Sequence, residues 1–175
     1  MRSQKFRFWW QGLVGGLLCL TGWVMAMSPP AHFDRGKDIP VTTVPVGPQG
    51  ATLRTGQTGT PIDNITVEIP AGALDRETTV TLAYNTGTLT LPSGNGSGVL
   101  LRLTAERVQT FQQLVTIRVH YDAKRYTNSV VVGYAIDEKD RLRAVNTESQ
   151  DSGAGTVAFS TYVPLLLTWA YAPVP

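Results

Sequence analysis

Cysteine is nearly missing from this chain of 175 residues. Its only cysteine, Cys19, lies in an apolar run near the N-terminus. The rest of the chain therefore cannot form a disulfide framework, a cysteine-rich zinc site or a cysteine nucleophile. Histidine is almost as scarce, because His32 and His120 are the only two and are far apart in sequence. No residue pattern indicates a cofactor or a metal ion.

Charge is also low, at 16% of the residues. The formal net charge of +2 depends on three residues near the N-terminus, Arg2, Lys5 and Arg7. Without them, twelve basic residues remain against thirteen acidic ones, and the net charge becomes −1. The remaining basic residues form no patch that could neutralise phosphates, so nucleic-acid binding is not expected.

The N-terminal residues have the order of a secretory signal peptide. Three positive charges precede the uncharged run from Phe8 to Met27, and small or tolerated residues stand before Met27. We therefore predict residues 1–26 as a signal peptide cleaved between Ala26 and Met27. The alternative is an uncleaved membrane anchor over residues 8–27, which approaches the ~20 apolar residues that a spanning helix needs. The expected location is the periplasm, cell surface or exterior, or the membrane through this anchor.

The chain after residue 48 reads as strands. Apolar and polar residues alternate in several segments, which is typical of half-buried strands in an antiparallel sheet. Residues 27–48 are spaced by prolines and are predicted as an extended lead-in, and residues 49–172 as an all-β antiparallel β-sandwich of about nine or ten short strands. The candidate strands are 51–54, 64–70, 78–84, 89–91, 99–104, 114–121, 130–136, 142–145, 156–160 and 165–171.

The turn from Pro70 to Leu74 is the most informative one. Pro70 has no N–H and ends the preceding strand. Gly72 can adopt the positive φ that reverses the chain. Leu74 then offers an apolar side chain to the core. We interpret Pro70, Gly72 and Leu74 as a structural motif rather than a ligand site.

Catalytic patterns are sparse. His120 falls on the polar face of its strand, and no Gly-x-Ser-x-Gly elbow presents a serine. The segment Pro92–Gly98 reads as a surface loop, and the acidic cluster Asp137–Asp140 as a hairpin tip without calcium-site spacing. Asn64 and Asn95 begin glycosylation patterns that are too common by chance to be assigned.

Three stretches resemble one family. Residues 65–74 are similar to the strand and Ile-Pro-x-Gly-Ala-Leu element of the β-sandwich domain shared by zona occludens proteins, netrin receptors and ankyrins, which also has exported bacterial versions. Residues 111–122 resemble that family's Phe-x-x-Pro-Val segment, with Leu114 in place of proline. Residues 158–162 stand where the family often has His-Phe-Ser.

The resemblance implies a module for protein interaction or structure. Some members of the family cleave themselves between Phe and Ser, with the preceding histidine as the activator. Here Ser160 matches the nucleophile, but Ala158 replaces the histidine, and a serine hydroxyl without a base is a weak nucleophile.

The sequence thus predicts a non-enzymatic exported module that binds another protein or an envelope component. A carbohydrate- or small-ligand-binding module is the alternative, and self-cleavage at Phe159-Ser160 is a remote one. Sugar binding needs exposed aromatic platforms. After the signal peptide only Trp169 remains as a tryptophan, in an apolar run where burial is expected.

Overall fold

The computed structural model describes residues 32–91 and 95–174. These residues form twelve strands and no helix. The predicted signal peptide or anchor, including Ala26 and Met27, lies outside the described residues. The strands are β1 (His32–Asp34), β2 (Asp38–Val46), β3 (Ala51–Arg54), β4 (Thr66–Ile69), β5 (Thr78–Asn85), β6 (Thr88–Thr90), β7 (Leu101–Ala105), β8 (Val115–His120), β9 (Ser129–Ile136), β10 (Leu142–Asp151), β11 (Thr156–Thr161) and β12 (Leu165–Pro173).

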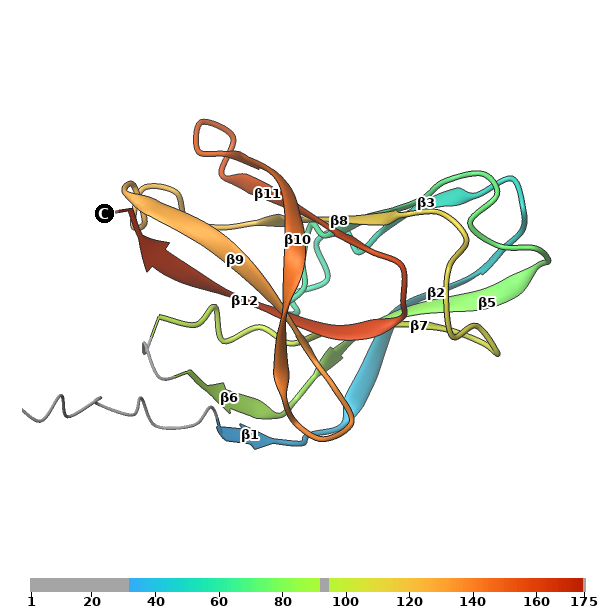
Figure 1. Cartoon of the computed structure of the whole chain (residues 1–175), viewed down its shortest axis with the longest axis horizontal. Helices are drawn as coiled ribbons and strands as arrows, with labels where there is room; N and C mark the ends of the chain where they lie inside the picture. Colours follow the sequence, from blue (N-terminus) through green and yellow to red (C-terminus); the bar gives the residue numbers. More distant parts are fainter. Residues whose placement is uncertain (1–31, 92–94, 175) are drawn as a thin grey trace, which may run out of the picture.

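Ten of these strands form one antiparallel sheet in the order β2-β5-β7-β12-β9-β10-β11-β8-β4-β3 (Figure 1). The two edge strands approach each other, because the hydroxyl of Thr42 on β2 donates to the carbonyl oxygen of Arg54 on β3 at 3.4 Å. The sheet is therefore nearly closed on itself. The all-β antiparallel class predicted from the sequence is confirmed.

One core fills the inside of this sheet. On β8, Val115, Ile117 and Val119 are fully buried, whereas His120 is exposed at the end of the strand. This agrees with the faces predicted from the alternation. On the neighbouring strand β11, Phe159 is paired with Ile117 and is also fully buried.

The ten candidate strands correspond to β3–β12, but no strand was expected in residues 32–46. The prediction of an extended lead-in over residues 27–48 is wrong. This segment contains β1, and it contains β2, which pairs with β5 and belongs to the large sheet. The sequence signal was hidden by Pro40 and Pro45, which usually interrupt strands. They are accommodated because β2 is an edge strand, where a missing N–H need not break a ladder.

A small second sheet covers the outside of the large one. β1 pairs with β6, and Phe33 and Leu89 from this pair pack on an apolar cluster of Leu100, Ile136 and Leu166. Figure 1 shows β1 and β6 together below the large sheet. The N-terminal part of the described chain is thus folded onto the domain.

Two further segments differ from their expected roles. Residues 95–98 of the predicted glycine- and serine-rich surface loop lie along β12, since Ser97 N–H donates to Trp169 O at 2.8 Å and Tyr171 N–H to Asn95 O at 3.0 Å. Strand β10 continues six residues beyond its predicted end at Val145. The second half of β10 is polar and was therefore not recognised as a strand. Its pairing with β11 supplies the hydrogen bonds that make it one.

Candidate functional site

The predicted turn at Pro70–Leu74 joins β4 to the segment before β5. Gly72 has a φ of 80°, the left-handed conformation expected for it, and its N–H donates to Pro48 O at 2.7 Å. Ala73 N–H donates to Pro70 O at 3.1 Å, and Leu74 is buried in the core. These contacts describe a close-packed turn that holds the end of β4 in place.

The three stretches that carry the family resemblance lie side by side. β4 pairs with β8, and β8 pairs with β11. At the same end, Gln112 N–H donates to Ala73 O at 2.9 Å, and Phe111 N–H donates to Tyr162 O at 2.6 Å. Segments that are far apart in sequence therefore form one continuous part of the molecule.

Ser160 lies in the middle of this region and is 4% exposed. Its Oγ accepts a hydrogen bond from Asn146 Nδ2 at 2.9 Å. Across the ladder Ser160 faces Thr116, while His120 faces Thr156, four residues earlier on β11. An amide that donates to the serine oxygen cannot take its proton, so this arrangement offers the hydroxyl no general base.

The same end exposes two apolar side chains whose exposure was not predicted from the sequence. Tyr162 is 52% exposed and Leu114 is 39% exposed. Thr161 pairs with Val115, so Tyr162 and Leu114 are the next residues along their neighbouring strands. The family that the sequence resembles has proline at the position of Leu114. This difference was the only sign in the sequence that set the position apart.

A depression of about 400 Å³ lies beside Leu114, and Pro70, Thr116 and Glu68 line its other sides. Pro70 is itself exposed. We call the surface made by Pro70, Leu114, Thr116 and Tyr162 the motif face. It combines an aromatic side chain, an aliphatic side chain and a polar hollow, which is the composition of many protein-binding surfaces.

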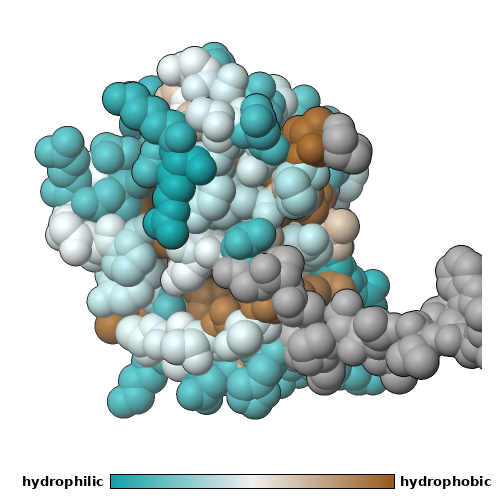
Figure 2. Space-filling view, turned by 90° about the vertical axis from the view of Figure 1, so that its left-hand side faces the viewer, coloured by the Kyte–Doolittle hydropathy of each residue, from teal (hydrophilic) through white to brown (hydrophobic). Residues whose placement is uncertain are grey.

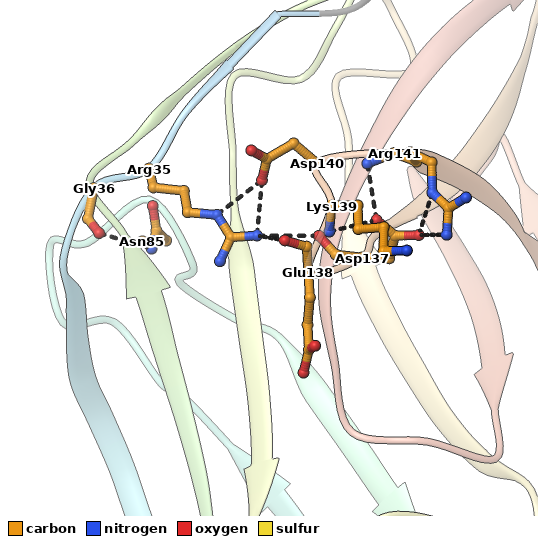
Figure 3. A network of polar contacts seen from close by, with 8 residues as sticks. All are labelled: Arg35, Gly36, Asn85, Asp137, Glu138, Lys139, Asp140 and Arg141. Carbon is orange, nitrogen blue, oxygen red and sulfur yellow. Dashed lines mark hydrogen bonds and ion pairs between the residues drawn. The ribbon is translucent and has the colours of Figure 1, made fainter.

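A polar network lies elsewhere, at the tip between β9 and β10 (Figure 3). The Arg35 guanidinium donates to Asp140 Oδ1 at 2.8 Å and to the carbonyl oxygens of Asp137 and Glu138. The backbone N–H and the side chain of Arg141 both donate to the Asp137 carboxylate and hold the pKa of Asp137 well below its usual range. The predicted hairpin tip is confirmed, and Arg35 fastens the β1–β2 connection to it.

The end of the molecule that carries the C-terminus is mostly hydrophilic, with apolar side chains in small separate areas (Figure 2). A cavity of about 500 Å³ lies there between residues 121–127 and 152–155. The rings of Tyr126 and Tyr171 stack near it, with centroids 3.5 Å apart. Burial raises the pKa of Tyr171 above its ordinary value of 10.0.

Trp169 is buried, at 3% exposure, as its place in an apolar run predicted. It therefore offers no aromatic platform at the surface.

Within residues 32–91 and 95–174, no three His, Cys, Asp or Glu side chains gather as metal ligands. The same part of the chain contains no helix long and apolar enough to cross a membrane. In the comparisons with known proteins, no family model and no curated protein matches this chain.

Proposed function

We propose that this chain is an exported, non-enzymatic β-sandwich module that binds another protein or an envelope component through the motif face. The observation that carries the proposal is the exposure of Tyr162 and Leu114 at the place where the three family-like stretches meet. Apolar side chains at this exposure are stabilised when a partner covers them, and tyrosine is among the residues that contribute most to protein interfaces. The family resemblance supports the same function.

The packing of Phe159 and Ser160 favours a structural role for these residues over self-cleavage. Phe159 fills the core, and Ser160 accepts a hydrogen bond from Asn146. The burial of Trp169 removes one aromatic platform for a sugar, but Tyr162 is an exposed aromatic ring, so a carbohydrate is the alternative ligand of the motif face.

Photo-crosslinking in the producing cell tests the proposal. A photoreactive residue is placed at position 162 or 114, and at position 130 as the control. Val130 is also exposed, at 46%, but belongs to β9 near the C-terminal end of the chain. We expect one defined crosslinked product from positions 162 and 114 and none from position 130. Equal products from all three positions, or none, would contradict the assignment of the motif face.

A further inference from the structure

Hydrogen-bonding side chains form a row across five neighbouring strands of the large sheet. Thr52 on β3 pairs with Glu68 on β4, and Glu68 pairs with Thr116 on β8. Thr116 pairs with Ser160 on β11, which pairs with Asn146 on β10. Residues that pair across a ladder lie side by side on one face, at the strand spacing of about 4.8 Å. We call these five residues the polar row.

An apolar row lies directly beside the polar row. Its members are the three apolar residues of the motif face, Pro70, Leu114 and Tyr162. Each of them is two residues from a member of the polar row on its own strand, the spacing at which side chains share a face. All three are exposed, Leu114 at 39% and Tyr162 at 52%. A ligand that lies across the strands therefore meets hydrogen-bonding groups along one side and apolar surface along the other.

The depression of about 400 Å³ on the motif face joins the two rows. Thr52, Glu68 and Thr116 line it from the polar row, and Pro70 and Leu114 line it from the apolar row. The depression is thus a concave site with apolar walls and a few polar groups, the usual composition of a small-ligand site. We call it the hollow.

The polar groups of the hollow have few partners of their own. The Glu68 side chain is 50% exposed, and its carboxylate has only an ion pair with Arg118, at 4.0 Å. The Thr116 hydroxyl donates to Glu148 Oε2 at 3.3 Å. Thr52 is exposed, and its hydroxyl makes no hydrogen bond with a described residue. The carboxylate and the hydroxyl groups therefore retain capacity for a ligand.

Charge narrows the class of ligand. Glu68 is the one charged residue among the described residues that line the hollow, and the Glu148 carboxylate lies next to Thr116. The two carboxylates repel an anionic ligand, and Arg118 already faces Glu68 and lowers its attraction for a cation. A neutral ligand is therefore favoured.

Hydrogen bonding narrows the class further. The two oxygens of a carboxylate accept from two donors, whereas a threonine hydroxyl both donates and accepts. The ligand that matches this set carries adjacent hydroxyl groups along one edge and C–H groups on its face. A neutral sugar ring has both features.

We propose that the hollow binds one neutral sugar unit of an envelope polysaccharide and that the next unit packs on the ring of Tyr162. This inference rests on the proposed function of the motif face and names its envelope component. Hydroxyl groups of the first unit donate to Glu68 and bond with Thr52 and Thr116, while its C–H face packs on Leu114. Tyr162 follows the partner strand of β8, so a chain that lies across the strands reaches both contacts.

An oligosaccharide array tests the class of ligand. The probes are neutral chains of hexoses and N-acetylhexosamines, and the controls are uronic acid chains of the same lengths. We expect the exported protein to bind a group of neutral chains and no uronic acid chain. Absence of binding to every neutral chain, or equal binding to the uronic acid chains, would overturn the proposal.

A pair of variants tests the place of the sugar. Glu68→Gln keeps the shape of the side chain but removes its charge, and it should weaken binding of the best neutral chain by at least about tenfold, because hydrogen bonds to charged groups are the strong ones. The matched control is Glu106→Gln, whose side chain is 61% exposed and lies outside the hollow. This control should leave the affinity unchanged. Equal effects of the two changes would overturn the assignment of the hollow.

Chain length tests the contact with Tyr162. In calorimetric titrations, the disaccharide from the best chain should bind more tightly than its monosaccharide. Tyr162→Ala should remove this gain and leave the affinity for the monosaccharide unchanged. An equal loss for both lengths would overturn the placement of the second unit.

The outcome can separate this inference from the proposed function. A crosslinked product from position 162 that protease digests completely would uphold the motif face and overturn the polysaccharide as its ligand. Binding of neutral chains that depends on Glu68, without a crosslinked product from position 162 or 114, would uphold the sugar site and contradict the proposed function.

Discussion

The ring of Phe159 lies directly against the backbone of Gly133. A Cβ at position 133 would lie 2.7 Å from Phe159 Cδ1, closer than carbon atoms approach in folded proteins. The glycine on β9 therefore makes room for the aromatic ring from β11, the strand on the other side of β10 in the sheet. Phe159, part of a stretch that resembles a cleavage motif, is thus a core residue of the fold.

Gly133→Ala should destabilise the protein, because the added methyl group forces the Phe159 ring out of its place. Overpacking of this kind costs about 1–3 kcal/mol. Urea unfolding of the variant gives the free energy of unfolding. The double variant with Phe159→Leu should lose less than the sum of the two single changes, because the smaller side chain makes room for the methyl group. Strictly additive losses would mean that the two residues do not compete for the same space.

The side-chain amide of Gln150 on β10 donates to the carbonyl oxygen of Ser129 at 2.9 Å and accepts from the N–H of Val131 at 2.8 Å, both on β9. Gln150→Ala should therefore destabilise the fold, because these two backbone groups lose their partner together. An unsatisfied buried polar group costs about 1–3 kcal/mol. The matched control is Ser149→Ala on the exposed neighbour, which should change the free energy of unfolding by less than about 0.5 kcal/mol. Equal effects of the two changes would show that the amide of Gln150 does not close the edge of β9.

The protein should lose part of its free energy of unfolding in acid because of Asp63. Hydrogen bonds from the Thr58 hydroxyl and from backbone N–H groups at residues 58–60 lower its pKa from 3.8 to about 2. The folded state therefore binds the proton less readily than the unfolded state, so the contribution of Asp63 is complete above pH 4 and disappears as the pH falls to 2. The midpoint of urea unfolding, measured from pH 6 to pH 2, should fall less steeply in Asp63→Asn than in the wild type. Parallel pH profiles would contradict this role for Asp63.

The Phe159–Ser160 bond should stay intact. Ser160 accepts a hydrogen bond from Asn146 and has no histidine opposite it in the ladder. Purified protein kept for days at neutral pH should remain one chain on a denaturing gel. A fragment that ends at Phe159 and is absent from Ser160→Ala would show that the hydroxyl is activated after all.

The N-terminus of the exported protein should begin at Met27. The motivation is the charged, then apolar, then small-residue order of residues 1–26. Mass spectrometry of the exported fraction identifies the first residue. An intact Met1 in membranes would favour the anchor instead, and an intact Met1 in the soluble cytoplasm would contradict export.

The sequence by itself determined where the strands β3–β12 lie, except for the second half of β10, and the faces of the best-patterned ones. Alternation with a period of two is a local property, so Val115, Ile117 and Val119 could be assigned to the core from their own segment. The turn at Gly72 was equally local, because only a residue without a side chain adopts its φ at no cost.

Only the tertiary structure decided which strands are neighbours. The order of the sheet, the proline-containing edge strand β2 and the change of partners in β10 depend on contacts between residues far apart in sequence. For the same reason no pattern within the chain predicted the contact of Phe159 with Gly133. Local periodicity specifies which side chains a strand can bury. Which strands pair with each other depends on the packing of the whole core, and the motif face lies where the pairing of β8 with β11 ends.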